Sequence, residues 1–270
     1  MALPALLFQD ISAVDIRESW NGGFVLFCFI ATFLSITGVT VLSFFVVKRE
    51  ERGEFVQGAY RSSAAILGIA FIQNIYGTSG MAPLMIIGTV PLYNAFAVIV
   101  LSLLKPGQRK MDKALLQKTL KGIVTNPIIL GIAAGFVWAI LKIPQPEILQ
   151  KTVKNMAVLA TPLGLMAMGA SFEGKKALGK LKPTLIASAL KLVVLAAIFL
   201  PMAVRLGYRE SELVAILVML GSATTVSSFV MARNMGYEGI LTSSIVMVTT
   251  LCSAFTLTGW LFLLKTLGLV

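Results

Sequence analysis

The segment Gly221–Val230, GSATTVSSFV, places five hydroxyl side chains inside an otherwise apolar stretch of the chain. A second apolar stretch, Tyr60–Ala70, carries Ser62, Ser63 and Gly68. Hydroxyls donate and accept hydrogen bonds, and glycine lets a helix break or lets a second helix approach closely. Where a helix breaks, the N-terminus of its second half offers N–H groups and partial positive charge to an anion. These residue types therefore predict anion binding.

Two basic side chains lie well inside apolar stretches. Lys191 lies near the centre of one, where a buried cation is costly and is a functional candidate by default. The alternative is that its long stem carries the ammonium group to the membrane surface or to a carbonyl partner. Arg61 lies closer to the end of its stretch, so snorkelling is the preferred interpretation there. All 12 Asp and Glu residues lie in loops or at the ends of apolar stretches, which favours an anionic substrate over a cation antiported through paired carboxylates.

The composition offers little for catalysis or for metal binding. The chain has no histidine, so the commonest general base and metal ligand is missing. Cys28 and Cys252 lie in separate apolar stretches and are interpreted as buried structural thiols. We therefore expect no catalytic residues, no metal site and no cofactor, and we do not expect an enzyme.

The elements that position these residues are predicted to be membrane helices. Hydrophobic residues make up 57% of the 270 and charged residues 13%, and the mean hydropathy is +0.88. A water-soluble domain of this composition would have too little polar surface to face water. A helix needs about 20 apolar residues to cross a membrane. The sequence predicts eight spans: 23–47, 55–76, 81–104, 125–143, 149–171, 183–205, 211–232 and 239–265.

Basic residues predict the orientation of these spans. They concentrate in the loops 105–124 and 172–182, which the positive-inside rule places in the cytoplasm. The net charge of +11 is therefore attributed to membrane topology, and no nucleic-acid partner is expected. Strict alternation also places the 48–54 loop and Arg233 inside, and the remaining loops and the C-terminus outside. We expect a multi-pass protein of the cytoplasmic (inner) membrane.

The sequence also repeats itself weakly, at a spacing of 159 residues. Tyr76–Gly80 corresponds to Met235–Gly239, and Ser63 corresponds to Ser222. An odd number of predicted crossings separates the corresponding positions. The two halves are therefore predicted to thread the membrane in opposite directions, as in many secondary transporters.

We accordingly predict an all-α polytopic membrane protein made of two inverted five-helix repeats whose discontinuous helices cross. The first repeat covers residues 1–104, a basic cytoplasmic linker covers 105–124, and the second, inverted repeat covers 125–270. When the two repeats are matched in this way, the first repeat lacks its first helix and most of its second. We therefore expect the chain to be a fragment or to have been assigned a late start codon.

The two hydroxyl-rich stretches are corresponding parts of the predicted repeats. Transporter sites commonly form where such helices unwind and cross near the membrane centre. Helix packing is the alternative, because small residues are enriched wherever membrane helices touch. Packing would be preferred for a single run, whereas two runs in corresponding positions favour a site. The predicted substrate-binding residues are Ser62, Ser63, Gly68, Lys191, Gly221, Ser222, Thr224, Thr225, Ser227 and Ser228.

Four segments carry a pattern seen in a known family: Ala2–Phe8, Thr125–Pro127, Ala160–Ser171 and Ser228–Gly236. Through them the chain resembles the auxin efflux carrier family of membrane transport proteins, including its bacterial malate/malonate permease-like members. The resemblance implies ten helices in two inverted repeats, crossover helices that build the site, and transport of small organic anions. The family usually has a proline in the second crossover, near Ala223, and this chain has none there.

The leading hypothesis is a secondary active transporter, a permease or efflux carrier that moves a small organic anion such as a dicarboxylate by alternating access. A sodium-coupled anion symporter of the bile-acid type is one alternative, for which the chain offers only Gln57, Gln73 and Asn74 as amide ligands. A non-transporting membrane scaffold or sensor is another. The expected partners are the organic anion and membrane lipid. Whether the protein forms a homodimer is left open by the sequence.

Overall fold

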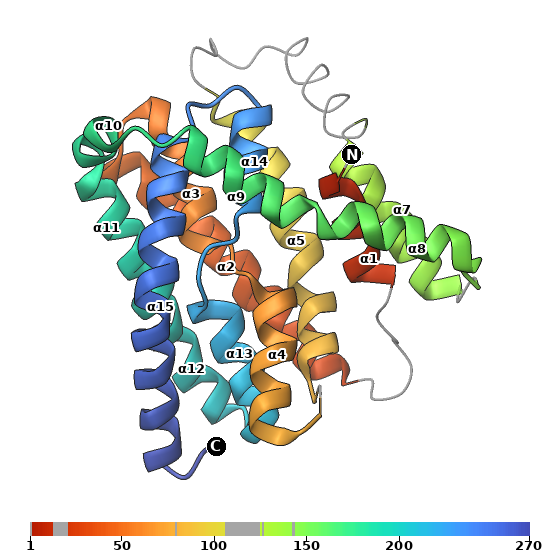
Figure 1. The fold of residues 1–270 in the computed structure, drawn as a ribbon. Helices are drawn as coiled ribbons and strands as arrows, with labels where there is room; N and C mark the ends of the chain where they lie inside the picture. The colour runs from red at the N-terminus through yellow and green to blue at the C-terminus, as the bar shows by residue number, and fades with distance from the viewer. Residues whose placement is uncertain (1, 13–20, 79, 106–124, 126, 142–143) are drawn as a thin grey trace.

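The computed structural model describes residues 2–12, 21–78, 80–105, 125, 127–141 and 144–270, and every regular element in these residues is helical (Figure 1). The predicted all-α fold is confirmed. The predicted linker lies outside the described residues except for Lys105. The helices are α1 (Ala2–Ser12), α2 (Gly22–Val46), η1 (Arg49–Glu51), α3 (Arg52–Tyr60), α4 (Ala64–Tyr76), α5 (Ala82–Leu103), α7 (Pro127–Leu141), α8 (Glu147–Val158), α9 (Ala160–Ala170), α10 (Gly174–Gly179), α11 (Leu181–Ala189), η2 (Leu190–Val194), α12 (Leu195–Arg205), α13 (Glu210–Gly221), α14 (Ser227–Asn234) and α15 (Ile240–Thr266).

Five helices in the described part of the chain are long and apolar enough to cross a membrane. They are α2, α5, the α8–α9 pair, the α11–α12 helix with its π-helical segment η2, and α15. The predicted span 125–143 contains the shorter apolar helix α7. Helices α8 and α9 run across the upper half of the molecule in Figure 1, at a steep angle to α5 and α15. The two remaining predicted spans, 55–76 and 211–232, are each interrupted.

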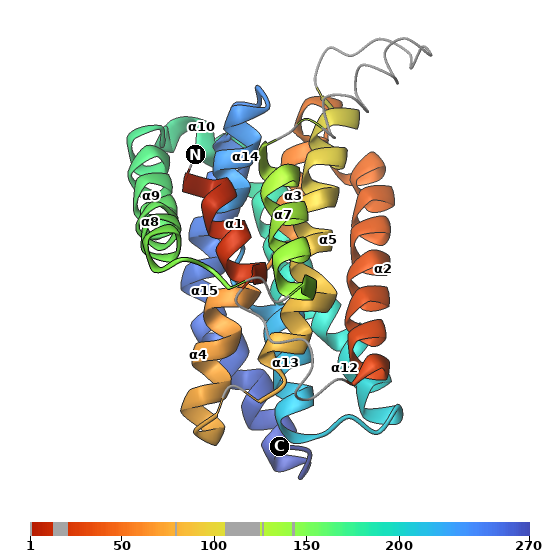
Figure 2. The ribbon, with the colours of Figure 1, turned by 90° about the vertical axis from the view of Figure 1, so that its right-hand side faces the viewer.

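Each interrupted span consists of two short helices joined by an extended stretch. Helix α3 ends at Tyr60 and α4 begins at Ala64, while α13 ends at Gly221 and α14 begins at Ser227. The two pairs run in opposite directions, since α3 and α14 lie in the upper half of Figure 1 and α4 and α13 in the lower half. Figure 2 shows the same arrangement from the side. An inverted repeat requires opposite directions, although the repeat itself stays a prediction.

The two extended stretches are bonded to each other. The Ser63 backbone N–H donates to the Ala223 carbonyl oxygen at 3.0 Å. The Thr224 hydroxyl donates to the Gly58 carbonyl oxygen at 2.7 Å, and the Thr224 N–H donates to the Thr249 hydroxyl on α15 at 3.1 Å. Broken backbone at membrane depth is tolerated only where protein or water satisfies its polar groups. Each break therefore helps to satisfy the polar groups of the other.

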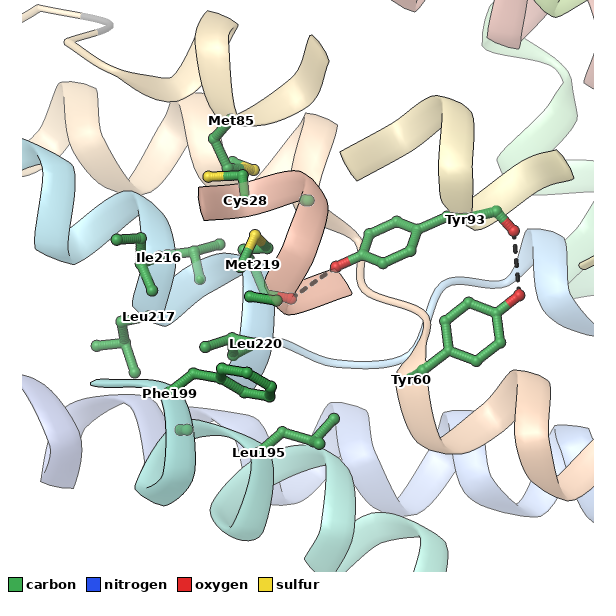
Figure 3. Close-up of a cluster of buried hydrophobic side chains, with 14 of the residues drawn as sticks. Cys28, Tyr60, Met85, Tyr93, Leu195, Phe199, Ile216, Leu217, Met219 and Leu220 are labelled. Atoms are coloured by element: carbon green, nitrogen blue, oxygen red, sulfur yellow. Dashed lines mark hydrogen bonds between the residues drawn. The ribbon is translucent and has the colours of Figure 1, made fainter. Parts of the chain in front are cut away.

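Helix α13 lies in the interior, where every residue from Leu213 to Leu220 is 2% exposed or less. The Tyr93 hydroxyl on α5 donates to the Met219 carbonyl oxygen at 3.0 Å, and the Tyr60 hydroxyl donates to the Tyr93 carbonyl oxygen at 3.1 Å (Figure 3). This pair of bonds connects the last turn of α3, the middle of α5 and the last turn of α13. The C-terminal ends of α3 and α13 are thereby both held against the continuous helix α5.

Two pairs of segments that are predicted to share a side of the membrane are in contact. At one end, Lys180 forms an ion pair with Glu51, which joins two loops predicted to be cytoplasmic. At the other end, the Glu210 N–H donates to the Leu269 carbonyl oxygen at 3.0 Å and joins two segments predicted to lie outside. The grouping of these loops fits the predicted topology. Which end faces the cytoplasm stays a prediction.

Glu54, in the first turn of α3, is 4% exposed and binds the start of α15. One carboxylate oxygen accepts from the Gly239 N–H at 3.0 Å. The other accepts from the Thr242 N–H at 2.8 Å and from the Thr242 hydroxyl at 2.9 Å. A negative charge and hydrogen-bond acceptors are both favourable at a helix N-terminus. The Glu54 side chain therefore caps α15 and holds this helix against α3.

Replacing this cap should destabilise the protein. In the Glu54→Ala variant, buried N–H donors of α15 lose their acceptor, which costs about 1–3 kcal/mol. Thermal unfolding in detergent should therefore show a lower apparent melting temperature. The control is Glu147→Ala, because Glu147 pairs with Lys151 on an exposed surface and should contribute less than about 1 kcal/mol. Equal melting temperatures for the two variants would contradict the capping role.

Candidate functional site

The crossing of the two interrupted helices brings most of the predicted site residues together. Helices α3 and α13 end there, and α4 and α14 begin there. The crossing therefore combines two partially negative carbonyl ends with two partially positive amide ends. The predicted residues in the two breaks and at the start of α14 are Ser62, Ser63, Ser222, Thr224, Thr225, Ser227 and Ser228.

These hydroxyl residues fall into two groups by exposure. Ser63, Thr225 and Ser227 are partly exposed, and the hydroxyl oxygens of Thr225 and Ser227 lie 3.2 Å apart. The buried group consists of Ser62, Ser222, Thr224 and Ser228.

Lys191 is fully buried in the π-helical segment η2, beside the end of α13. Its ammonium group donates to the Leu220 carbonyl oxygen at 2.6 Å, to the Met219 carbonyl oxygen at 3.3 Å and to the Ser62 hydroxyl. Three acceptors match the three N–H donors of a lysine. They include two carbonyls at the C-terminal end of a helix, where a positive charge is favoured. Lys191 thus connects η2 to α13 and to the first break.

Arg61 is 2% exposed, so the interpretation of this side chain as snorkelling is wrong. One terminal nitrogen donates to the Asn94 side-chain oxygen on α5 at 2.5 Å and to the Ser227 hydroxyl on α14 at 2.9 Å. The other lies 2.7 Å from the Met231 sulfur. These internal partners hold the guanidinium inside the protein, where a snorkelling side chain would extend to the headgroups.

The partners of Arg61 are all neutral. Within the residues that the structure describes, no carboxylate pairs with its guanidinium, and the Arg61 Nε has no hydrogen-bond partner. The Met231 sulfur is only a weak acceptor. The guanidinium therefore keeps donor capacity and a positive charge that the described side chains do not neutralise.

The two buried cations face helix ends of opposite polarity. Lys191 bonds to the carbonyl end of α13, whereas Arg61 bonds to Ser227, the first residue of α14. A helix N-terminus disfavours a cation by about 0.3–1 kcal/mol even at exposed sites. Burying a cation at the membrane centre costs roughly 2.5–3.5 kcal/mol on insertion scales. An anion between the guanidinium and α14 would offset both costs, so Arg61 is the stronger candidate for anion binding.

Buried polar side chains without partners extend this region. Gln57, Ser222 and Ser228 are all 0% exposed, and their side-chain polar atoms form no hydrogen bond with any described residue. Such atoms are uncommon in proteins, because burial removes their hydration without compensation. In Gln57 both the Nε2 and the Oε1 are unpaired.

The two glycines among the predicted site residues, Gly68 and Gly221, differ in how closely other atoms surround them. A Cβ added to Gly68 would lie 2.6 Å from the Met85 Cε of α5, the end of a flexible side chain that would have to shift. A Cβ added to Gly221 would lie 3.5 Å from the nearest atom, on Leu217, which is an ordinary contact distance. Gly221 is the last residue of α13 and precedes the second break.

The cysteines and acidic residues form no ligand cluster. Among the described residues, no group of three or more His, Cys, Asp or Glu side chains could hold a metal ion. Cys28 is buried as predicted, but the prediction that Cys252 is buried is wrong. Cys252 lies on an outward face of α15 beside Leu251 and near Phe255, which are 72% and 80% exposed.

The sequence analysis did not identify Asn94 as a site residue, and it interpreted Arg61 as snorkelling although this side chain is buried. Asn94 lies inside the long apolar helix α5, one turn after Pro91. A polar side chain at such a position usually faces protein or a water-filled cavity, so the residue could have been identified. Its pairing with Arg61 could not, because the two residues are 33 positions apart and meet only in the folded chain.

Comparisons with known proteins agree with this architecture. The sequence model of the family described as "Membrane transport protein" matches residues 1–261. A protein of Rhizobium meliloti (strain 1021), described as "Putative malonate transporter", is 26% identical over 274 residues, and the alignment covers 98% of this chain and 84% of that protein. Because the family match covers nearly the whole chain, the protein belongs to the membrane transport protein family, the auxin efflux carrier family that its sequence resembles.

Proposed function

We propose that this protein is a secondary active transporter that moves a small organic anion, such as a dicarboxylate, across the cytoplasmic membrane by alternating access. The family supports transport in general. The observation that supports an anionic substrate is Arg61, a buried cation beside the N-terminus of α14 with no carboxylate partner in the described residues. Malonate is the first substrate to test, because the Rhizobium relative is described as a malonate transporter.

A carboxylate fits the donors at this position. The guanidinium group presents N–H donors in a planar fork that matches the two oxygens of a carboxylate. The Thr225 and Ser227 hydroxyls add neutral donors on the partly exposed side. A bound carboxylate would replace the Met231 sulfur as a partner of Arg61, and so exchange a weak acceptor for a charged one.

The helix contacts suggest which parts move during alternating access. Helix α1 packs on α7 and on α8, and this group reaches the remaining helices through contacts of α7 with α5 and of α1 and α8 with α9, which in turn contacts α14. Figure 1 shows α1, α7 and α8 together on one side of the molecule. The crossing, by contrast, is bonded to α5, α15 and η2. We infer that the crossing moves as one body relative to the α1–α7–α8 group.

Sodium coupling receives little support from the amide side chains. Gln73 and Asn74 are exposed on α4, and of the three amides named from the sequence only Gln57 is buried. The described residues therefore do not bring these amides together as a cation site. Replacing sodium by choline in the uptake assay below should leave the flux unchanged.

The central test is uptake by liposomes that contain the purified protein. Wild type should accumulate labelled malonate above protein-free liposomes, and Arg61→Met should lower the flux by about tenfold or more, because it removes charge-assisted hydrogen bonds worth roughly 1.5–3 kcal/mol. Arg61→Lys keeps the charge but loses the fork, so it should retain part of the flux. Arg205→Met, at an exposed arginine, is the matched control.

Thermal unfolding of the same variants separates binding from folding. Arg61→Met removes a buried cation that has no anionic partner in the described residues, but it also leaves the Asn94 side-chain oxygen without its donor. These two effects oppose each other, so the melting temperature should stay close to that of wild type. If liposomes that contain the wild-type protein take up neither malonate nor succinate, the proposed function is contradicted. A wild-type flux in Arg61→Met would contradict the role of Arg61.

Lys191 should behave differently from Arg61, since its donors are already used by α13 and Ser62. The Lys191→Met variant should have a lower melting temperature and a lower maximal flux, while the half-saturating malonate concentration stays within about twofold of wild type. The measurement is uptake against malonate concentration, together with thermal unfolding. A tenfold rise in the half-saturating concentration at an unchanged melting temperature would instead assign Lys191 to the substrate, as the sequence suggested.

A further inference from the structure

Gly53 and Gln57 on α3 and Arg61, the residue that follows α3, are spaced four residues apart, so their side chains lie in a row on one face. The surroundings of the two outer residues are known. A Cβ added to Gly53 would lie 2.3 Å from the Tyr237 hydroxyl oxygen, so this glycine lies directly against the segment that follows α14. Arg61 bonds to Asn94 on α5 and also to the start of α14. Gln57, between them, therefore faces the seam between α5 and α14.

This seam offers almost no polar partners to an amide. The buried hydrophobic cluster between the two helices consists of Ala97, Val98, Leu101, Met231, Ala232 and Tyr237. The Tyr237 hydroxyl is already used, since it donates to the Leu101 carbonyl oxygen at 2.9 Å. Ser228, in the first turn of α14, adds one buried hydroxyl that has no partner among the described residues.

A structural role does not explain an amide at this position. Gln57 is 0% exposed, and neither of its two polar atoms bonds to a described residue. An apolar side chain of similar size would fill the same space without burying unpaired polar atoms. Departures from good packing chemistry of this kind are expected at functional sites.

We propose that Gln57 is a specificity-determining residue, which donates its Nε2–H to the second carboxylate of a dicarboxylate whose first carboxylate is bound by Arg61. This inference rests on the proposed function and narrows the substrate class to short dicarboxylates. Gln57 and Arg61 are one helical turn apart, so their side chains are neighbours that the two ends of one short dicarboxylate can contact. The Ser228 hydroxyl supplies a further donor from the opposite side of the seam.

The proposed contact explains selectivity in physical terms. A dicarboxylate would engage both Arg61 and Gln57, so the buried amide would gain a charged partner. A monocarboxylate would engage Arg61 alone and leave the amide unpaired. A site built to hydrogen-bond a substrate group rejects the analogue that lacks this group, because its own polar atoms then stay unsatisfied.

The test uses Gln57→Leu and the matched control Gln73→Leu, an exposed glutamine on α4. In liposomes, uptake of labelled malonate gives the half-saturating concentration, and competition by unlabelled acetate measures monocarboxylate binding. Gln57→Leu should raise the half-saturating malonate concentration by about tenfold or more, while the acetate concentration that halves uptake stays within about twofold of wild type. Gln73→Leu should change neither value.

Thermal unfolding adds a readout that a structural role would move in the opposite direction. Because Gln57→Leu removes unpaired buried polar atoms, its melting temperature should equal or exceed that of wild type. A lower melting temperature together with equal weakening of malonate and acetate would overturn the inference, and so would unchanged malonate affinity. If wild type takes up no carboxylate at all, the proposed function fails instead, so the two failures are distinguishable.

Discussion

Two buried positive charges dominate the centre of this molecule, one beside a partially negative helix end and the other beside a partially positive one. Lys191 lies at the carbonyl end of α13, where the local dipoles and two carbonyl oxygens stabilise it. Arg61 lies at the amide end of α14 with neutral partners only. The first charge is matched by the protein itself, whereas the second is matched best by an anion from outside. In the proposed function, this difference separates a residue that positions the crossing, Lys191, from one that would bind the substrate, Arg61.

The remaining structure keeps these two charges in place. The breaks that create the helix ends would be unstable alone in a membrane, and they are held by the Ser63–Ala223 and Thr224–Gly58 hydrogen bonds between them. Glu54 fixes the start of α15 against α3. The buried helix α13 provides a surface on which α2, α4, α5, α12, α15 and η2 pack. The hydrogen bonds between the breaks satisfy backbone groups that the interruptions leave free, which lets a polar site exist at membrane depth.

The sequence predicts the general design but not the contacts. The hydroxyl run in Gly221–Val230 and its counterpart near Ser62 predict the two breaks, since such polar runs inside apolar spans favour interruption at a site. The long apolar stretches likewise predict α2, α5, α11–α12 and α15. Lys191 is buried, and its carbonyl partners match the alternative that the sequence left open. Its acceptors at the end of α13 depend on how the helices pack, which no local pattern specifies.

Arg61 and Gln57 show why the rest could not be predicted. Whether an arginine snorkels or is buried depends on which hydrogen-bond partners lie within its reach. The partner Ser227 is 166 positions away from Arg61 in the sequence, so the contact exists only in the folded chain. Gln57 is one of several amides in the sequence, and only its buried, unpaired state distinguishes it from exposed Gln73. The depth of a residue within a membrane span can be estimated from the sequence. Whether a positive or a negative helix end will lie beside that residue cannot.

Direct observation of the bound anion tests the role of Arg61 best. A cryo-electron microscopy reconstruction of the protein in lipid nanodiscs, with malonate at saturating concentration, should show a carboxylate within hydrogen-bond distance of the Arg61 guanidinium and the Ser227 hydroxyl. Lys191 should keep its bonds to the Met219 and Leu220 carbonyl oxygens. A carboxylate bound to Lys191 instead, with Arg61 still held only by Asn94, Ser227 and Met231, would contradict the assignment.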